Sequence, residues 1–201
     1  MNNEFHSFLR TRRSVRHFSS RKVPDEVVQR VLETATYAPS AHNRQPWRFV
    51  IVATIEARWH LAQAISKKLE ADMQVDGAPT EDIHGRVERT IQRTTEAPLI
   101  VLLCRDITQV DDQPDAPRRR IEAEMGRQSV ALAGLQLLLA AEAEGLSGTW
   151  ICWPLFAPEE TLQALNLPQT WEPLGMLFIG YPAMHPQPAP RKPLQEITLY
   201  I

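Results

Sequence analysis

Apolar residues along this chain recur in two alternating patterns. Val27, Val31 and Ala35 are four residues apart, a spacing that places them on one face of a helix. Continuous apolar runs predict buried strands at 47–53 and at 99–104, the second with both faces covered. We expect helices over 4–11, 24–35, 55–71, 81–95, 121–144 and 158–166, and two more strands within 145–153 and 171–182.

The expected helix at 121–144 is apolar on nearly all sides and carries many small residues. A sheet would cover only one of its faces, so we expect a second subunit to cover the other, with the small residues allowing close approach. The tail from 183 to 201 is rich in proline and ends in the strand-like run Ile197–Ile201. We expect this run to extend a sheet edge, in its own subunit or in its partner's.

Composition and charge narrow the class of protein. The chain has 201 residues, 43% hydrophobic and 23% charged, which fits one globular domain spanning 1–201. The formal net charge of −2 gives no basic footprint for nucleic acid. The longest apolar run, Leu99–Cys104, is too short to cross a membrane, and residues 1–18 lack the apolar core of a secretory signal. Cys104 and Cys152 predict neither a disulfide framework nor a zinc site, so we expect a cytoplasmic protein.

The stretch 38–47 is polar although it lies between an apolar helix and an apolar strand. Hydrogen-bonding side chains are held there between two prolines that restrict the backbone. A site for a planar ligand has this character, and an ordinary rigid turn is the alternative. The hydrogen-bonding side chains are those of Ser40, His42, Asn43 and Gln45.

A basic segment follows the first expected helix. If residues 11–18 are extended, Arg12, Ser14 and Arg16 share one face. Two guanidinium groups and a hydroxyl on one face suit a phosphate, because arginine stays ionised and forms charge-assisted hydrogen bonds. A solvated basic segment is the alternative, and we expect Arg118–Arg120 to be such a solvated face.

A glycine also precedes the strand expected within 145–153. Gly148 before Thr149 would let a backbone amide approach a flat ligand without an intervening side chain. The alternative is a plain helix end followed by a strand.

The sequence lacks the motifs of several common types of catalytic and cofactor-binding site. There is no dinucleotide-binding GxGxxG, no phosphate-binding GxxxxGK[ST] and no GxSxG nucleophile elbow. The six histidines lie far apart, so we expect no metal site. Residues that grip a ligand without an obvious catalytic acid, base or nucleophile suit an enzyme whose cofactor carries the chemistry.

Four motifs in order resemble the nitroreductase family of FMN-dependent oxidoreductases over essentially the whole chain. They are Arg12–Phe18, Pro39–Trp47, Gly145–Trp150 and Arg191–Leu194. The region from Trp171 to Pro182 resembles more closely the C-terminal reductase domain of the glutamyl ligases that build the deazaflavin coenzyme F-420. The ligase half has no room in 201 residues, so we expect no ligase activity.

The resemblance implies an α+β, nitroreductase-like fold: a mixed, mainly antiparallel sheet flanked by helices. It also implies an intertwined homodimer with two FMN sites at the subunit interface. The protein would contribute no catalytic residue of its own, because FMN carries the chemistry at its N5 atom.

The resemblance also implies roles for particular residues. The phosphate of FMN would be held near the N-terminus and by the tail, and the flavin ring would be contacted from both subunits. Many members of the family have Gly-Leu-Gly where this chain has Gly145-Leu146-Ser147-Gly148, which leaves open which amide faces N5. The implied assignments are Arg12, Arg13 and Ser14 with Arg191 or Lys192 for the phosphate, Arg16 for the pyrimidine edge, Pro39, Ser40, Ala41, Asn43 and Gln45 from the other subunit, and Gly148 and Thr149 near N5.

The implied reaction uses NADH or NADPH to reduce FMN, after which a small oxidised acceptor such as a nitroaromatic or a quinone takes the same space. Trp153, Phe156 and the helix at 81–95 could shape that space. Two alternatives stay open at this point: a flavin-dependent reductase of deazaflavin-coenzyme metabolism, and a flavin-binding or sensing protein without turnover.

Overall fold

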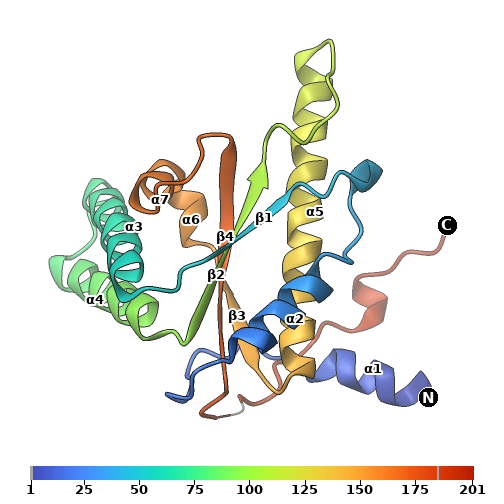
Figure 1. Cartoon of the computed structure of the whole chain (residues 1–201), viewed down its shortest axis with the longest axis horizontal. Helices are drawn as coiled ribbons and strands as arrows, with labels where there is room; N and C mark the ends of the chain where they lie inside the picture. Colours follow the sequence, from blue (N-terminus) through green and yellow to red (C-terminus); the bar gives the residue numbers. More distant parts are fainter. Residues whose placement is uncertain (1, 185) are drawn as a thin grey trace.

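A computed structural model describes residues 2–184 and 186–201. The chain forms three layers, in which a sheet separates helices α2 and α5 from helices α3, α4, α6 and α7 (Figure 1). The family's fold class predicted from the sequence, an α+β arrangement of a sheet flanked by helices, is confirmed.

The sheet has four strands in the order β1-β2-β4-β3, and all neighbouring strands are antiparallel. A parallel element is present only as an isolated bridge between Ser14 and Gly148, as far as the described residues show. The expected mixed sheet is therefore antiparallel in all of its named strands. Their bounds are β1 (Trp47–Ile51), β2 (Leu99–Asp106), β3 (Ser147–Ile151) and β4 (Trp171–Gly180).

Strand β2 is buried along its whole length, as its continuous apolar run predicted. Val101 and Leu103 point into the core shared with α2 and α5, whereas Ile100 and Leu102 point into the core shared with α3. Because successive side chains of a strand alternate between faces, one apolar strand fills both cores.

Helices α2 (Asp25–Ala35) and α5 (Ala116–Ala143) cover one face of the sheet. A Cβ at Gly134 would lie 2.3 Å from Trp150, so glycine allows α5 to approach the sheet closely. On its other side, α5 leaves Ile121, Leu132 and Leu135 exposed. Its own chain therefore covers only one face of this apolar helix.

Four helices cover the opposite face of the sheet. Two are long and packed together, α3 (Ile55–Val75) and α4 (Thr80–Glu96), and two are short, α6 (Trp153–Phe156) and α7 (Pro158–Ala164). The sequence did not predict α6, because Trp153 was taken as the end of a strand and four residues carry no helical periodicity. No helix of the described residues is long and apolar enough to cross a membrane.

The two ends of the chain lie outside these layers. Helix α1 (Asn2–Thr11) precedes the sheet, and the tail contains only a short 3-10 helix, η2 (Leu194–Glu196). Among the described residues, the run 197–201 has no strand partner in its own chain and is exposed. Pairing of this run with a sheet edge of the partner stays a prediction.

Candidate active site

Residues 12–18, which we call the strap, meet the open edge of β3 at Ser14 and continue to the segment after β4, where Phe18 bridges to Pro182. Ser14 pairs with Gly148 in the parallel bridge, and the N–H of Val15 donates to the Gly148 carbonyl at 3.1 Å. Val15 is buried, so an apolar side chain and a backbone hydrogen bond hold the strap in place. The structure thus brings together two segments that are 134 positions apart and that the sequence assigned to one ligand.

The arginine side chains of the strap differ in the number of hydrogen bonds that they form within their own chain. Arg13 Nη1 donates to the carbonyls of Arg10 and Thr11 and so caps the end of α1. Arg16 Nη1 lies 3.4 Å from the Ser14 carbonyl. Within the described part of the chain, the Arg12 guanidinium has no hydrogen-bond acceptor. Arg12 therefore keeps all its donors for a ligand.

Gly148 has a packing role that the sequence did not reveal. A Cβ here would lie 2.8 Å from Leu138 Cδ2 and 3.0 Å from the Phe178 carbonyl oxygen. The absent side chain thus makes room for the core, and the predicted approach of a flat ligand to this backbone stays a prediction. The next residue, Thr149, is buried, and its Oγ1 has no partner among the described residues.

The polar stretch between Pro39 and Pro46, which we call the loop, holds three non-glycine residues in left-handed backbone conformations. The φ angles are +52° for His42, +53° for Asn43 and +49° for Gln45. His42 and Asn43 lie in a single 3-10 turn, η1 (Ala41–Asn43). Such conformations cost about 1–2 kcal/mol per residue, so surrounding contacts must fix them.

Those contacts come from within the loop and from α5. Ala41 N–H donates to Ser129 Oγ at 3.2 Å, and Ser129 in turn donates to the Met125 carbonyl. The N–H of Gln45 donates to Ser40 Oγ at 3.1 Å. Ser40, Ala41 and Gln45 are thus fixed within their own chain.

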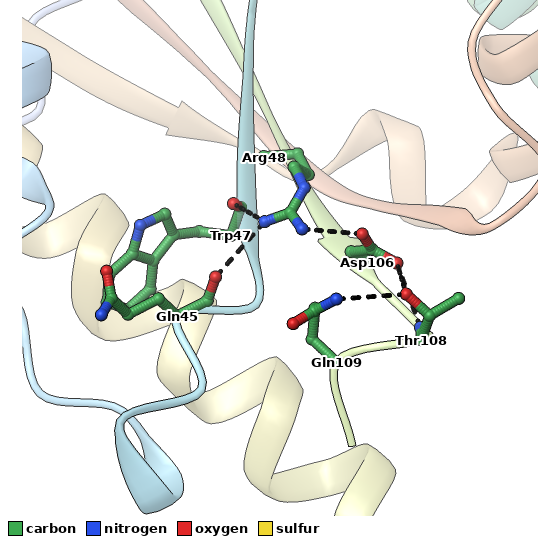
Figure 2. A network of polar contacts seen from close by, with 6 residues as sticks. All are labelled: Gln45, Trp47, Arg48, Asp106, Thr108 and Gln109. Atoms are coloured by element: carbon green, nitrogen blue, oxygen red, sulfur yellow. Dashed lines mark hydrogen bonds and ion pairs between the residues drawn. The ribbon is translucent and has the colours of Figure 1, made fainter.

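Figure 2 shows how the loop is joined to the sheet. Arg48 of β1 donates through Nη1 to the carbonyls of Gln45 and Trp47, and through Nη2 to Asp106 Oδ2 at 2.7 Å. Thr108 donates its N–H and hydroxyl to the other Asp106 oxygen. Burial alone would raise the pKa of Asp106, but the Thr108 hydrogen bonds and the Arg48 charge outweigh it and lower that pKa. The carboxylate therefore stays ionised and holds Arg48 against the loop.

The strap and the loop lie apart in one chain. The loop contacts α5 at Ser129, whereas Gly148, which holds the strap, packs against Leu138 on the same helix. Nine residues of helix correspond to about 14 Å along its axis. The two halves of the site inferred from the sequence do not meet within a single subunit.

The basic residues of the tail also lie apart from the strap. Arg191 and Lys192 are exposed, and Arg191 donates only to the carbonyls of Ala189 and Pro190. No hydrogen bond or ion pair joins them to residues 12–16 in the described part of the chain. Their predicted role with a phosphate stays a prediction.

Two neighbouring cavities open beneath α4. The larger, about 550 Å³, lies between α3, α4 and α6 and is lined by Trp153 and Phe156. The smaller, about 350 Å³, is lined by Arg16 and Phe18 of the strap and by Phe178 of β4. The three elements proposed from the sequence to shape a substrate space, Trp153, Phe156 and the helix at 81–95, do surround one cavity.

A sequence model described as the Nitroreductase family matches residues 9–181. The chain belongs to the nitroreductase family. As a member of this family, the chain is an oxidoreductase. The matched range begins near the end of α1 and ends one residue after β4.

Curated relatives and solved structures agree with this membership. The chain is 33% identical to 5,6-dimethylbenzimidazole synthase of Rhodospirillum rubrum over 88% of its length and 82% of that protein. It is 29% identical to the putative NAD(P)H nitroreductase YfhC of Bacillus subtilis, over 94% of this chain and 89% of that protein. A putative nitroreductase from Desulfovibrio desulfuricans, solved in complex with FMN, has the same fold with a TM-score of 0.72 and 23% identity over 98% of this chain and 95% of that one. None of the relatives named here is a coenzyme F-420 ligase, so they do not support the predicted finer resemblance to the reductase domain of those ligases.

Sequence reasoning missed several residues that fix the geometry of this nitroreductase-family site. Arg48, Asp106 and Ser129 hold the loop through contacts between residues far apart in the sequence. A charged residue inside an apolar strand, Arg48, and another at the end of one, Asp106, were a usable signal, because buried charges need partners.

The structure also places one possible metal-binding group. Ligand atoms of His42, Asp111 and Glu122 lie within 4.8 Å of one another. Arg44 forms an ion pair with Asp111, and Gln113 donates to Glu122, so both carboxylates already have partners.

Of the six histidines considered as possible metal ligands, His185 lies outside the described residues.

Proposed function

We propose that this chain binds FMN and uses NADH or NADPH to reduce small oxidised acceptors such as nitroaromatics or quinones. Family membership, a relative named as an NAD(P)H nitroreductase and a structural neighbour that contains FMN support the proposal. The observation that carries it is the position of the strap, in which Ser14, flanked by Arg12 and Arg16, pairs with Gly148 at the edge of β3.

The residues present fit this cofactor. Arg12 and Ser14, with Arg13 beside them, offer cationic and hydroxyl donors to a phosphate, and Arg12 has no competing acceptor among the described residues. Arg16 would place positive charge at the pyrimidine edge, and Thr149 offers a buried hydroxyl without a partner near the same strand. When bound, FMN would supply the hydride chemistry, while the residues of this chain bind the cofactor and exclude water.

We further propose that the functional unit is a homodimer in which the loop completes the site of the other subunit. The separation of about 14 Å between strap and loop contacts along α5 supports this assignment. So do the exposed apolar residues Leu132 and Leu135 of α5, and the exposed apolar tail that ends at Ile201. The tail would then lie on the partner, close enough for Arg191 or Lys192 to reach its phosphate.

The absorption spectrum of the purified protein tests the cofactor. A yellow protein that releases FMN on denaturation and is bleached by NADH or NADPH is the expected result. Arg12→Ala combined with Ser14→Ala should weaken FMN binding by about 10²- to 10⁴-fold, since each hydrogen bond to a charged group contributes about 1.5–3 kcal/mol. Arg120→Ala, which removes an exposed arginine of α5, is the matched control. A colourless protein that cannot be reconstituted would overturn the proposal.

A mixing experiment tests the shared site. One variant carries Arg12→Ala and Ser14→Ala, and a second carries Asn43→Ala and Gln45→Ala in the loop. Each variant alone should be inactive, but unfolding and refolding them together should restore about a quarter of the sites, because half of the dimers are mixed and each has one intact site. Absence of any recovery in a mixture shown to contain mixed dimers would contradict the loop assignment.

Two other candidate activities have a specific basis. The 33% identical relative favours a test for 5,6-dimethylbenzimidazole formation by the flavin-loaded protein. The residues from Trp171 to Pro182 favour a test for tight binding of a deazaflavin. A bound flavin that no donor reduces would instead support a binding or sensing protein without turnover.

A further inference from the structure

Helix α4 carries three arginines on the side that lines the larger cavity. Arg86, Arg89 and Arg93 are three and four residues apart, a spacing that aligns side chains along one face of a helix. Arg89 and Arg93 also line the smaller cavity, which Arg16 and Phe18 of the strap border. The two cavities therefore share these two guanidinium groups.

These arginines are not neutralised by their surroundings. Lys68 and Asp72, which also line the larger cavity, pair with each other, and Glu96 of the smaller cavity accepts a hydrogen bond from Gln92. Within the described residues, the guanidinium groups of Arg86, Arg89 and Arg93 form no ion pair and no hydrogen bond. The two cavities together have five cationic and three acidic side chains, in a chain whose formal net charge is −2.

The same space has aromatic walls. Trp153 lines the larger cavity and packs edge-on against Phe178 of the smaller one, with ring centroids 6.0 Å apart. Phe156, at the larger cavity, is 70% exposed. Apolar rings beside unpaired guanidinium groups suit a flat molecule that carries a negative charge at one end.

We propose that the arginines of α4 bind the anionic group of a reaction partner, so that the enzyme prefers substrates with a carboxylate or phosphate. The inference rests on the proposed function, because it places the arginines beside the strap that would hold FMN. The anion could belong to an aromatic acceptor or to the 2′-phosphate that distinguishes NADPH from NADH. Both place a negative oxygen group against Arg89 and Arg93.

Paired substrates separate the two sources. With NADH as donor, 4-nitrobenzoate and its neutral methyl ester are compared as acceptors; with a neutral quinone as acceptor, NADPH is compared with NADH. We expect kcat/KM to be about tenfold or more higher for the more negatively charged member of one pair, which is 4-nitrobenzoate or NADPH; this is the size of a partly exposed charged hydrogen bond. Rising salt should reduce this ratio, because the arginines are partly exposed.

Substitutions then connect the preference to α4. Arg89→Ala with Arg93→Ala should bring the ratio close to one, Arg89→Lys with Arg93→Lys should retain part of it, and Arg120→Ala should leave it unchanged. Retention and bleaching of the flavin are measured first in every variant. A variant that keeps its flavin and its full preference for the anion, or a wild-type enzyme with no preference in either pair, would overturn the inference alone.

A direct binding measurement makes the outcome independent of turnover. Calorimetric titration of the purified protein with 4-nitrobenzoate, with the methyl ester and with NADP⁺, which carries the 2′-phosphate but cannot reduce the flavin, should detect binding of the anionic probe, and the double alanine variant should bind it at least tenfold more weakly. Equal affinity of wild type and variant for every anionic probe would also overturn the inference. Loss of FMN from the wild-type protein, by contrast, would count against the proposed function.

Discussion

We propose that the strap of one subunit and the loop of its partner contact the same flavin. Within one chain, however, the side chains of these two segments are held to very different degrees. The loop is held by Ser129, by Ser40 and by Arg48, and it carries three left-handed residues. The strap is held by a buried valine and backbone hydrogen bonds, while the Arg12 side chain is left without an acceptor in the described part of the chain. The conformation of the loop is thus fixed by contacts within its own chain. In the strap, by contrast, the Arg12 guanidinium remains available to bind a ligand.

The largest effect should come from blocking the position of the strap. Gly148→Ala introduces a Cβ that meets Leu138, the Phe178 carbonyl and Ile179, and such overpacking costs about 1–3 kcal/mol. We expect lower stability together with weaker FMN retention, because a shift of the Gly148 backbone would also displace Ser14 and Val15, which pair with it. Denaturant unfolding and flavin release measure the two effects.

Thr149→Val is the matched control for the stability effect of Gly148→Ala, since it changes the next residue without adding volume. Its buried Oγ1 has no partner among the described residues, so stability should stay the same or rise. If Gly148→Ala kept both full stability and full flavin content, the strap would not depend on this close contact.

The next effect should come from releasing the loop from the sheet. Arg48→Ala removes three hydrogen bonds and leaves the carboxylate of Asp106, 8% exposed, without its cation. We expect a loss of about 1–2 kcal/mol in the free energy of unfolding, less than the cost of breaking a fully buried pair, because the Arg48 side chain is 30% exposed.

Arg44→Ala provides the comparison for Arg48→Ala. Its ion pair with Asp111 is more exposed, so its removal should cost less than about 1 kcal/mol. Equal effects of the two substitutions in denaturant unfolding would show that Arg48 is not a special anchor.

A smaller effect should come from the contact between the loop and α5. Ser129→Ala leaves the Ala41 N–H without its acceptor and should cost about 1 kcal/mol. Ser66→Ala, at another buried serine whose Oγ has no partner among the described residues, should cost nothing or stabilise. Thermal unfolding of both variants measures the difference, and a larger loss for Ser66→Ala would contradict the assignment.

The smallest effect should come from the backbone of the loop itself. Gln45 has a φ of +49°, which glycine adopts freely and alanine does not. Gln45→Gly and Gln45→Ala remove the same side-chain hydrogen bond to Asn43, so their difference isolates the backbone. We expect the glycine variant to be the more stable by about 1 kcal/mol in denaturant unfolding. No difference would mean that the loop relaxes to another conformation.

Local patterns in the sequence predicted the layers of this fold well. The run Leu99–Cys104 predicted a strand buried on both faces, and the apolar character of α5 matched a helix with one face left uncovered by its own chain. The position of the tail was left open between its own sheet and the partner's, because apolar composition does not reveal which strand edge is free to pair. Helix α6 was too short to leave a periodic pattern.

The site was predictable in its residue types but only partly in its geometry. Arg12 to Arg16 and Gly148 were chosen from motifs, and the structure does bring Ser14 against Gly148. The left-handed conformation of Gln45 could not be predicted, because glutamine does not favour it. The anchoring by Arg48 and Ser129 depends on contacts between distant segments, which periodicity does not encode.

The two cysteines of this chain differ in a way that provides a practical probe. Cys104 is buried in β2, and burial raises the pKa of its thiol to about 12, so it should resist labelling. Cys152 is exposed and directly precedes Trp153, which lines the larger cavity. A fluorescent maleimide should therefore attach at one position in the folded enzyme, near the cavity mouth. Such a label would report on ligand entry in real time without any change to the sequence.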